Sequence, residues 1–282
     1  MKIKHLAPMG AALAFVLATP ALAQTGEPVD WTGPYVGGSF GYTFQKSDEN
    51  EHVRFDTNGD GNFDNQPLLG SGAPAFSPGT CGGSARGRTP AAGCNDDKNA
   101  IGWMGHVGYD MQFGNIVAGI VGEAGKSYIS DSVTEFSTTP ASYTFTRRID
   151  WNANLRARLG YTTNSGIMPY ITGGLAYAKV KNSFGQDGNF NNSFTADNGK
   201  EDAWGWTMGG GVEAKVAPNF SIGARYLWTR YKANDYTVTA GPNPNGLPPT
   251  AFNNGFTNGQ TVMNRGDKFD TQSVMATASF RF

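Results

Sequence analysis

Eight stretches of this chain alternate apolar and polar side chains at every second position, which is the pattern of β-strands with one apolar face. The clearest stretch runs from Trp151 to Tyr161, where Leu155, Ala157 and Leu159 alternate with polar or small residues. The other stretches occupy residues 35–45, 101–112, 116–128, 170–180, 204–216, 220–229 and 268–282. Each covers the ~9–11 residues that a tilted strand needs to cross a bilayer.

Short and long connections alternate between these stretches. The short connections lie near residues 113–115, 164–166 and 217–219. The long connections cover residues 46–100, 129–147, 181–203 and 232–268. Bacterial outer-membrane barrels segregate their connections in this way, with short turns in the periplasm and long loops outside the cell. We therefore predict an all-β fold: an eight-stranded antiparallel transmembrane β-barrel with short periplasmic turns, long extracellular loops and both mature termini in the periplasm.

The start of the chain has the features of a secretory signal peptide. Lys2 and Lys4 give a positive beginning, an apolar run follows, and Ala21-Leu22-Ala23 supplies the small residues that signal peptidase requires. A transmembrane helix is the alternative, but the apolar run is shorter than the ~20 residues of a membrane span. The predicted domains are a signal peptide at 1–23 and an outer-membrane barrel at 24–282, with 46–100 as the first extracellular loop.

The last predicted strand ends the chain on an aromatic residue. Counting back by twos from Phe282 gives Phe280, Ala278 and Ala276 on one face, while Arg281 belongs to the opposite, mostly polar face. This pattern resembles the terminal strand by which outer-membrane barrels are recognised for assembly. Phe280 and Phe282 are therefore the predicted assembly signal, and the barrel-assembly machinery is an expected partner.

Composition and charge agree with a barrel. The chain has 39 glycines in 282 residues, about twice the usual ~7 %, and tight turns and a crowded lumen both favour glycine. Removing residues 1–23, which hold two Lys and no acid, leaves 20 basic against 23 acidic residues and a net charge of −3. This balance argues against nucleic acid as a partner.

Aromatic residues recur at the ends of the predicted strands. They are Tyr35, Tyr42, Phe44, Trp103, Tyr109, Trp151, Tyr161, Tyr177, Trp204, Trp228 and Phe282. Each one could be ordinary packing, but the repetition across strands favours girdles at the two membrane interfaces.

Four segments carry a family resemblance: WTGPYVGGSFGY, GWMGHVGYDMQFGNIVAGIVGEAG, WNANLRARLGY and MPYITGGLAYA, together with the Phe282 ending. They resemble the alphaproteobacterial outer-membrane β-barrel family often described as "porin family" or major surface antigen, which is similar in architecture to the transmembrane barrel of OmpA. The resemblance implies location in the bacterial outer membrane and contact with its lipid and lipopolysaccharide. It leaves a ligand of the loops and a homo-oligomer open. Because the last predicted strand ends at Phe282, OmpA's periplasmic peptidoglycan-binding domain is expected to be lacking.

Cys81 and Cys94 are the two cysteines of the chain, and both belong to the predicted first loop. In an exported protein a disulfide is the default state of such a pair. The spacing alone is not a metal-binding signature, so we predict a disulfide between them.

The inward faces of the predicted strands collect charged side chains. The expected lumen charge network consists of Glu123, Arg156, Arg158, Glu213, Lys215 and Arg225, and Asp110 and Arg281 share the same inward parity. An eight-stranded barrel is only wide enough for side chains to fill, and an uncompensated buried ion costs several kcal/mol. The charges are therefore expected to pair and close the barrel, and the alternative is a narrow or gated pore.

The sharpest local motif lies in the first loop. Oxygen-bearing side chains at positions one, three and five, a Gly at six and an apolar residue at eight match the start of an EF-hand-type calcium loop. The candidate ligands are Asp56, Asn58, Asp60, Asn62 and Asp64. Position twelve is Pro67 where a Glu belongs. The alternative is a turn-rich polar loop, because Asp, Asn and Gly are also common turn formers.

The sequence gives little support to catalysis. His5 leaves with the signal peptide, His52 lies in a loop, and His106 has no nearby nucleophile along the chain. No organic cofactor is indicated. The expected function is a non-enzymatic outer-membrane barrel that contributes to envelope structure and exposes its loops at the surface. A small-solute porin or gated channel is the alternative, and an outer-membrane enzyme acting on lipid comes third.

Overall fold

The structure is a computed structural model of the whole chain. It describes residues 29–45, 51–188, 192–233, 236–241, 251–252, 261–266 and 268–282. The predicted signal peptide lies outside the described residues. Among those residues, no helix is long and apolar enough to cross a membrane.

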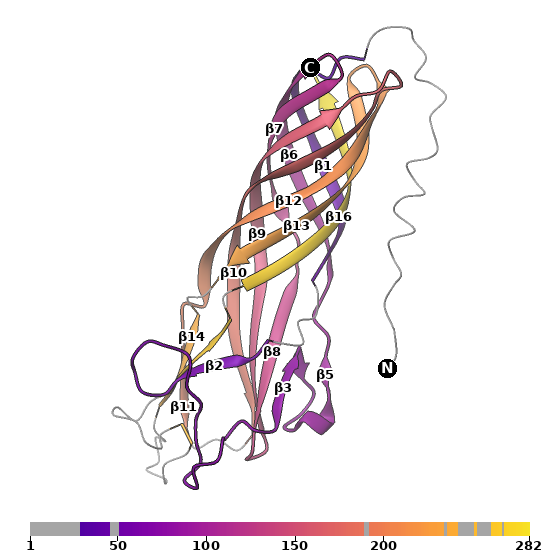
Figure 1. Cartoon of the computed structure of the whole chain (residues 1–282). Helices are drawn as coiled ribbons and strands as arrows, with labels where there is room; N and C mark the ends of the chain where they lie inside the picture. Colours follow the sequence, from indigo (N-terminus) through magenta and orange to yellow (C-terminus); the bar gives the residue numbers. More distant parts are fainter. Residues whose placement is uncertain are drawn as a thin grey trace.

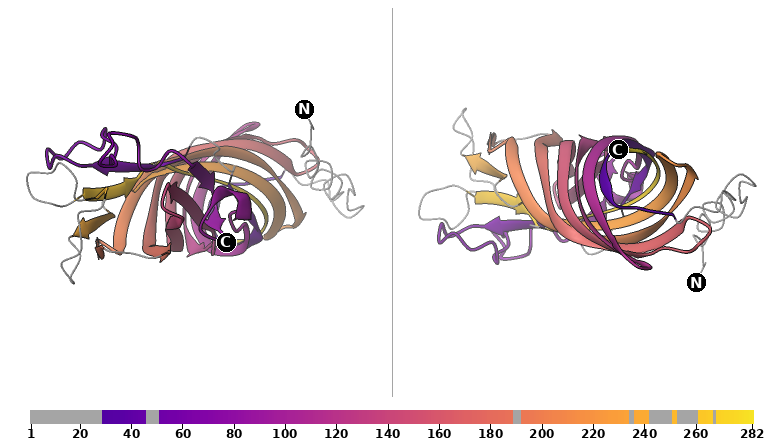
Figure 2. Two further views of the ribbon diagram at one scale, coloured as in Figure 1. Left: turned by 90° about the horizontal axis from the view of Figure 1, so that it is seen from below. Right: turned by 90° about the horizontal axis from the view of Figure 1, so that it is seen from above.

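Within the described residues, eight strands pair in a closed antiparallel ring, which confirms the predicted all-β barrel. In ring order they are β1 (Gly33–Phe44), β6 (Ala100–Phe113), β7 (Ile116–Lys126), β9 (Ala141–Tyr161), β10 (Ile167–Asp187), β12 (Lys200–Ala217), β13 (Phe220–Lys232) and β16 (Lys268–Arg281). Each strand pairs with the next, and β16 returns to pair with β1 from Tyr35↔Arg281 to Phe44↔Gln272. Figure 2 shows the strands curving around into a barrel.

The period-two pattern decides which side chains face outward. Apolar residues of each wall strand are exposed on the outer surface, such as Leu155 (58 %) and Ile171 (67 %), while the residues between them are mostly buried in the lumen. Lumen-facing glycines leave room for larger neighbours. A Cβ at Gly108 would overlap the Tyr35 ring, and one at Gly119 would overlap the Asp110 carboxylate.

The two ends of the barrel differ. At one end, which we call the turn end, β6 is joined to β7 through residues 114–115 and β12 to β13 through residues 218–219. Gly114 and Gly166 have positive φ angles of 61° and 73° there, which glycine adopts without strain. The C-terminus also lies at this end (Figure 1). The opposite end, with the long connections, is the loop end.

The long connections, which the sequence predicted as extracellular loops, contain further strands. Residues 130–137 and the beginning of β9 form a β-hairpin, and β10 continues seven residues past the predicted end at Val180. Further strands in these connections are β2 (Val53–Asp56), β3 (Gly79–Gly82), β4 (Ser84–Ala85), β5 (Cys94–Asn95), β8 (Ser130–Ser137), β11 (Ser193–Asp197), β14 (Thr237–Gly241) and β15 (Thr261–Arg265), with a short 3-10 helix η1 (Pro90–Ala92). We call this folded part the loop-end head (Figure 1).

The loop-end head has its own apolar core, which explains why the connections are ordered. Strands β11, β14, β15 and β2 form a four-stranded sheet, and β3 extends the barrel sheet through β8. The buried core residues are Val53, Phe55, Ala75, Phe76, Val133, Ala141, Tyr143, Phe145, Tyr236, Val238, Ala240, Phe252 and Met263. Period-two counting across the long connections overlooks these residues because they come from several short, separate segments.

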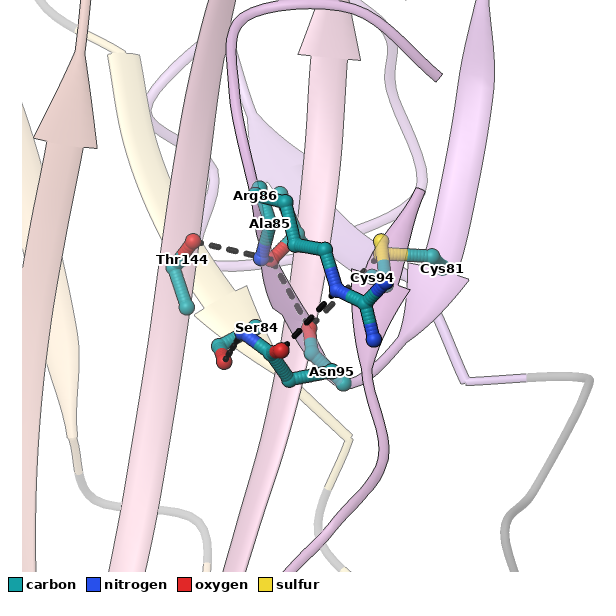
Figure 3. The surroundings of a disulfide bond; sticks show 9 residues. Cys81, Ser84, Ala85, Arg86, Cys94, Asn95 and Thr144 are labelled. Atoms are coloured by element: carbon teal, nitrogen blue, oxygen red, sulfur yellow. Dashed lines mark hydrogen bonds between the residues drawn. A yellow bond between two sulfur atoms is a disulfide. The ribbon is translucent and has the colours of Figure 1, made fainter. Parts of the chain in front are cut away.

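Cys81 and Cys94 are joined by a disulfide in the loop-end head (Figure 3), as the sequence predicted. Cys81 lies on β3, opposite Thr134 of β8, and Cys94 lies on β5, opposite Ala85 of β4. The bond therefore ties the small β4–β5 ribbon to the strand that continues the barrel sheet. Arg86 Nε donates to Asn95 Oδ1 at 2.9 Å across the same ribbon.

Removing the disulfide should loosen the ribbon and leave the barrel intact. In the chain-entropy model, a closed segment of this length is worth about 3 kcal/mol. We expect the Cys81→Ser/Cys94→Ser variant to be cleaved faster within residues 79–95 by a protease, while the barrel keeps its heat-modifiable mobility in gels. Two titratable thiols in non-reduced, denatured wild-type protein would contradict the assignment.

Deleting Phe282 should slow or prevent insertion into the outer membrane. The Phe282 amide donates to Pro34 O at 3.1 Å, and its exposed ring packs on Phe280 with ring centroids 5.2 Å apart. The deletion removes both the last inter-strand bond and the aromatic end of the apolar face. The amount of heat-modifiable barrel in outer-membrane fractions measures the effect, and Phe282→Tyr, which keeps the ring, should insert normally. Wild-type levels of the deletion variant would refute the prediction.

Candidate functional site

The lumen contains one layer of charged side chains, which we call the charge layer. Its members are Asp110, Glu123, Arg156, Arg158, Glu213, Arg225 and Arg281. They come from β6, β7, β9, β12, β13 and β16, so nearly every wall strand contributes. Their side chains are at most 6 % exposed, and water can therefore screen them very little.

Glu123 forms the first group of ion pairs. Its carboxylate lies 2.9 Å from Arg156 Nη2 and 2.5 Å from Arg225 Nη2. Asn154 Nδ2 donates a further hydrogen bond to Glu123 Oε1 at 3.1 Å. Arg225 Nη2 also donates to Ser39 Oγ at 3.0 Å, so this group connects β7, β9, β13 and β1.

Asp110 and Glu213 form the second group, with Arg158 between them. Arg158 contacts the Asp110 carboxylate and donates to Glu213 Oε1 at 2.6 Å. Arg281 Nη1 lies 2.8 Å from Asp110 Oδ2, and Arg281 Nη2 lies 3.5 Å from Glu213 Oε2. The Arg158 guanidinium also lies 4.7 Å from the centre of the Tyr35 ring. Strand parity predicted pairing for both glutamates and placed Asp110 and Arg281 on inward faces, although the predicted network did not include these two residues.

Lys215 is a correction to the predicted network. Its Nζ donates to the carbonyl oxygens of Asp30 and Pro218 and lies 5.6 Å from the centre of the Trp31 ring. Lys215 has the inward parity, but it is near the turn-end limit of β12, where backbone carbonyls are within reach of its side chain. It pairs with neither Glu123 nor Glu213 among the described contacts.

Trp31 closes the turn end of the lumen, and sequence reasoning assigned it no role. Its side chain is fully buried, and its Nε1 donates to Thr162 Oγ1 at 2.8 Å. Arg281 Nη1 donates to Trp31 O at 2.9 Å, and the Arg281 guanidinium lies 4.6 Å from the centre of the indole ring. The sequence feature that could have indicated this position is a tryptophan directly before the first alternating stretch.

Two small cavities lie within the barrel, and neither is large enough for a solute. The first, about 10 Å³, is lined by Tyr35, His106, Arg156, Arg158 and Arg225 among others. The second, about 20 Å³, lies beside polar residues that include Asn152 and Asn154. Volumes of this order match single water molecules.

An apolar layer fills the lumen on the loop-end side. Its members are Ile129, Ile149, Ala176, Ala178, Val180, Ala203, Tyr231, Ala233 and Phe269. Most of them occupy inward positions of β9, β10, β12, β13 and β16, and Ile129 and Ala233 lie next to strand ends. The sequence predicted charged side chains on the inward faces but did not predict this apolar layer. The layer adds an apolar barrier to the charge layer.

A cluster of buried ions joins the barrel to the loop-end head. Asp131 Oδ2 accepts from Arg147 Nε at 2.7 Å and from Arg265 Nη2 at 2.9 Å. Burial, and then the neighbouring Asp131 charge, raise the pKa of the Asp97 carboxyl to about 7. Burial alone raises the pKa of Glu135 to about 7. The folded state binds the protons of the Asp97 and Glu135 carboxyls more tightly than the unfolded state does. The free energy of unfolding therefore falls as the pH rises from the ordinary pKa of a carboxyl towards 7.

His106 has a serine partner that the sequence did not suggest. Its Nε2 lies 2.8 Å from Ser279 Oγ, a residue 173 positions away. Both side chains are buried, and His106 Nδ1 has no hydrogen-bond partner in the described part of the chain. A Ser–His nucleophile needs an orienting group and access for substrate. The geometry offers neither, so the contact supports packing rather than catalysis.

The candidate calcium loop forms a compact turn around Asp56 at the end of β2. Asp56 Oδ1 accepts from the Gly59 amide at 2.8 Å, and Oδ2 accepts from the Gly61 amide at 2.9 Å. Asp60 Oδ1 accepts from the Asn62 amide at 2.7 Å, which lowers the pKa of the Asp60 carboxyl. In the described part of the chain, no group of three or more His, Cys, Asp and Glu side chains is placed to hold a metal ion.

Calcium binding at this loop stays a prediction that calorimetry can test. If the loop binds, millimolar calcium should give a heat signal, because Asp56, Asn58, Asp60 and the Asn62 carbonyl would become ligands. Asp60→Ala removes a charged ligand and should abolish the signal, whereas Asp96→Ala, an exposed acid of the same connection, should not. A wild-type protein that shows no heat at millimolar calcium has only a turn-rich loop here.

The chain matches known outer-membrane proteins. A family model described as "Outer membrane protein beta-barrel domain" matches residues 9–282. The chain is 32% identical over 224 residues to the 31 kDa outer-membrane immunogenic protein of Brucella melitensis, covering 76% of this chain and 78% of that relative. It is 31% identical over 175 residues to the 22 kDa outer membrane protein of Rhizobium leguminosarum, covering 61% and 69%.

Among solved structures, the outer membrane protein OprG of Pseudomonas aeruginosa is similar with a TM-score of 0.47 and 12% identity, covering 89% of this chain and 97% of that one. The family assignment depends on the family model and the relatives, not on this structural likeness. The family model matches most of the chain, and the Brucella relative matches over three quarters of each sequence. The chain therefore belongs to the outer membrane protein β-barrel domain family.

Proposed function

We propose that this protein is a non-enzymatic integral barrel that contributes to the structure of the bacterial outer membrane and displays its loop-end head outside the cell. The observation that carries the proposal is the filled lumen. Trp31, the charge layer and the apolar layer follow one another along the barrel, and the cavities among them are of water size. Such an interior holds the wall together, and the side chains in the described part of the chain fill the lumen against solutes.

The proposed orientation follows from the two ends of the barrel. Outer-membrane barrels have short periplasmic turns and longer extracellular loops. By this rule the turn end, with Trp31 and Phe282, faces the periplasm and the loop-end head faces outward. The Brucella melitensis relative is named an outer-membrane immunogenic protein, and an exposed, folded head is the part of this chain that fits such surface exposure.

A small-solute porin or gated channel is the alternative function. Opening a path would require breaking the buried ion pairs and also displacing side chains of the apolar layer, such as Tyr231 and Phe269. Breaking a buried pair by removing one partner costs about 3–5 kcal/mol. Spontaneous openings of the wild-type barrel should therefore be rare.

Replacing both Glu123 and Glu213 by Gln tests the proposal. The change leaves Arg156, Arg225 and Arg158 with fewer anionic partners inside the lumen. We expect a loss of stability of several kcal/mol in denaturant unfolding and a small leak that favours anions. Wild-type protein in planar lipid bilayers should show only rare, small openings.

The matched control is Asp270→Asn, which removes the carboxylate of a partly exposed pair with Arg230 on the outer wall. It should change stability by less than about 1 kcal/mol and leave the membrane closed. Steady wild-type conductance on the scale of a general porin would overturn the structural role and establish the channel. A double Gln variant as stable and as closed as wild type would show that the charge layer does not hold the barrel shut.

A further inference from the structure

The outer surface of the barrel has a strong charge asymmetry along its axis. In the half next to the turn end, the outward positions of all eight wall strands are apolar, from Pro34 and Val36 on β1 to Ala276, Ala278 and Phe280 on β16. Near the loop end, outward positions carry eight basic residues against Asp150, Asp202 and Asp270. The basic residues, which we call the basic rim, are Lys126, Arg148, Lys179, Lys181, Lys200, Arg230, Lys232 and Lys268.

Three members of the basic rim stand directly beside one another. Lys181 of β10 is the register partner of Arg148 on β9 and of Lys200 on β12. Figure 1 shows these three strands adjacent in the wall. Like charges directly opposite each other on neighbouring strands are destabilising. The row Arg148–Lys181–Lys200 therefore costs the isolated protein stability and creates a local excess of positive charge.

The acidic neighbours offset only part of this charge. Asp150 Oδ2 lies 3.0 Å from Lys181 Nζ, and Asp202 Oδ1 lies 2.7 Å from Lys179 Nζ. Arg148 and Lys126 also lie within electrostatic range of Asp150. Lys179 and Lys181 remain more than a third exposed in these pairs, so they can reach a further anion.

An aromatic triad lies directly below the row and marks the depth of the membrane interface. The Tyr177 ring centre lies 5.1 Å from that of Trp151 and 5.0 Å from that of Trp204, on the same three strands. Amphipathic aromatic rings occupy the level of lipid headgroups. Below them the wall is apolar, with Leu155 and Leu175 exposed. The basic row is thus at headgroup level, with a surface for acyl chains beneath it.

We propose that the row Arg148–Lys181–Lys200, together with Lys179, binds the phosphorylated sugar headgroup of lipopolysaccharide, with its acyl chains lying along β9, β10 and β12. A phosphate between the three basic side chains removes their mutual repulsion, and the aromatic triad fixes the depth of the sugar. The inference rests on the proposed orientation, because lipopolysaccharide occupies the outer leaflet. It goes beyond that proposal by naming the lipid and its site.

Lipid binding by the purified full-length barrel in neutral detergent tests the site. Native mass spectrometry measures the affinity for bisphosphorylated lipid A and for the same lipid without phosphates. The variant Arg148→Gln/Lys181→Gln/Lys200→Gln removes the row. Each basic residue near an anionic surface contributes about fivefold in affinity, so the triple variant should bind bisphosphorylated lipid A about a hundredfold more weakly. The dephosphorylated lipid should bind wild type and variant equally.

A matched control separates a site from general charge attraction. Arg86→Gln/Arg88→Gln/Lys98→Gln makes the same charge change at exposed positions of the loop-end head and should alter lipid affinity by less than about twofold. Without lipid, the row variant should melt at the same temperature as wild type or higher, because repulsion has been removed. If the triple variant fails to fold by heat-modifiable mobility, Lys200→Gln alone should weaken binding about fivefold.

Four results would overturn the site. They are wild-type affinity in the row variant, equal affinity for the two lipids, an equal loss in the head control, and displacement of the lipid by excess inorganic phosphate, which would indicate a free-anion site instead. The proposed structural role fails separately, through conductance. A conducting barrel that still prefers phosphorylated lipid at the row would refute that role and keep the lipid site.

Discussion

The hydrocarbon core of a membrane offers no water to backbone N–H and C=O groups, and this constraint governs the whole wall. Every such group must find a partner inside the protein, which a sheet achieves only by closing on itself. The pairing of β16 with β1 supplies that closure, and it aligns the outward apolar positions of all eight strands described here into a continuous lipid-facing surface. Closure with so few strands also fixes a narrow lumen, which side chains must fill.

The narrow lumen imposes a second requirement: the charged side chains inside it must be paired with one another. Three carboxylates and four guanidinium groups share the charge layer, and each ion pair joins residues from different strands. Buried pairs are weak evidence of stability, since apolar substitutes often do as well. Their geometry is specific, however. The pair between Glu123 and Arg225 joins strands on different parts of the ring, so one wrong register would leave several ions without partners.

The sequence carried enough information for the wall and for most of the charge layer, because both follow from strict alternation. Arg156 and Arg158 could be placed inward from parity alone, and their partners Glu123 and Glu213 followed from the need for neutrality. Parity predicts whether a side chain faces the lumen, but it does not predict its position along the barrel axis. Lys215 was therefore misplaced, because its side chain reaches backbone carbonyls at the turn end instead of the glutamates.

The loop-end head could not be predicted in the same way. Phe55, Tyr143 and Val238 are far apart in the chain, and their segments are too short for periodicity to be counted. Only tertiary packing brings them together. The contact between His106 and Ser279 has the same origin, since 173 residues separate its members. The residues of the basic rim, by contrast, could be placed at outward positions from the sequence. The proposed lipid site, however, depends on the register that places Lys181 between Arg148 and Lys200.

The contact between Trp31 and Arg281 at the turn end has a consequence for the order in which the chain folds. Its carbonyl accepts from Arg281, which is 250 residues away, and its indole ring rests against the same guanidinium. Arg281 reaches that position only once β16 has paired with β1, so these two contacts of Trp31 cannot form while the sheet is still open. The contacts between Trp31 and Arg281 are therefore late events in folding, and they form when the open sheet becomes a closed barrel.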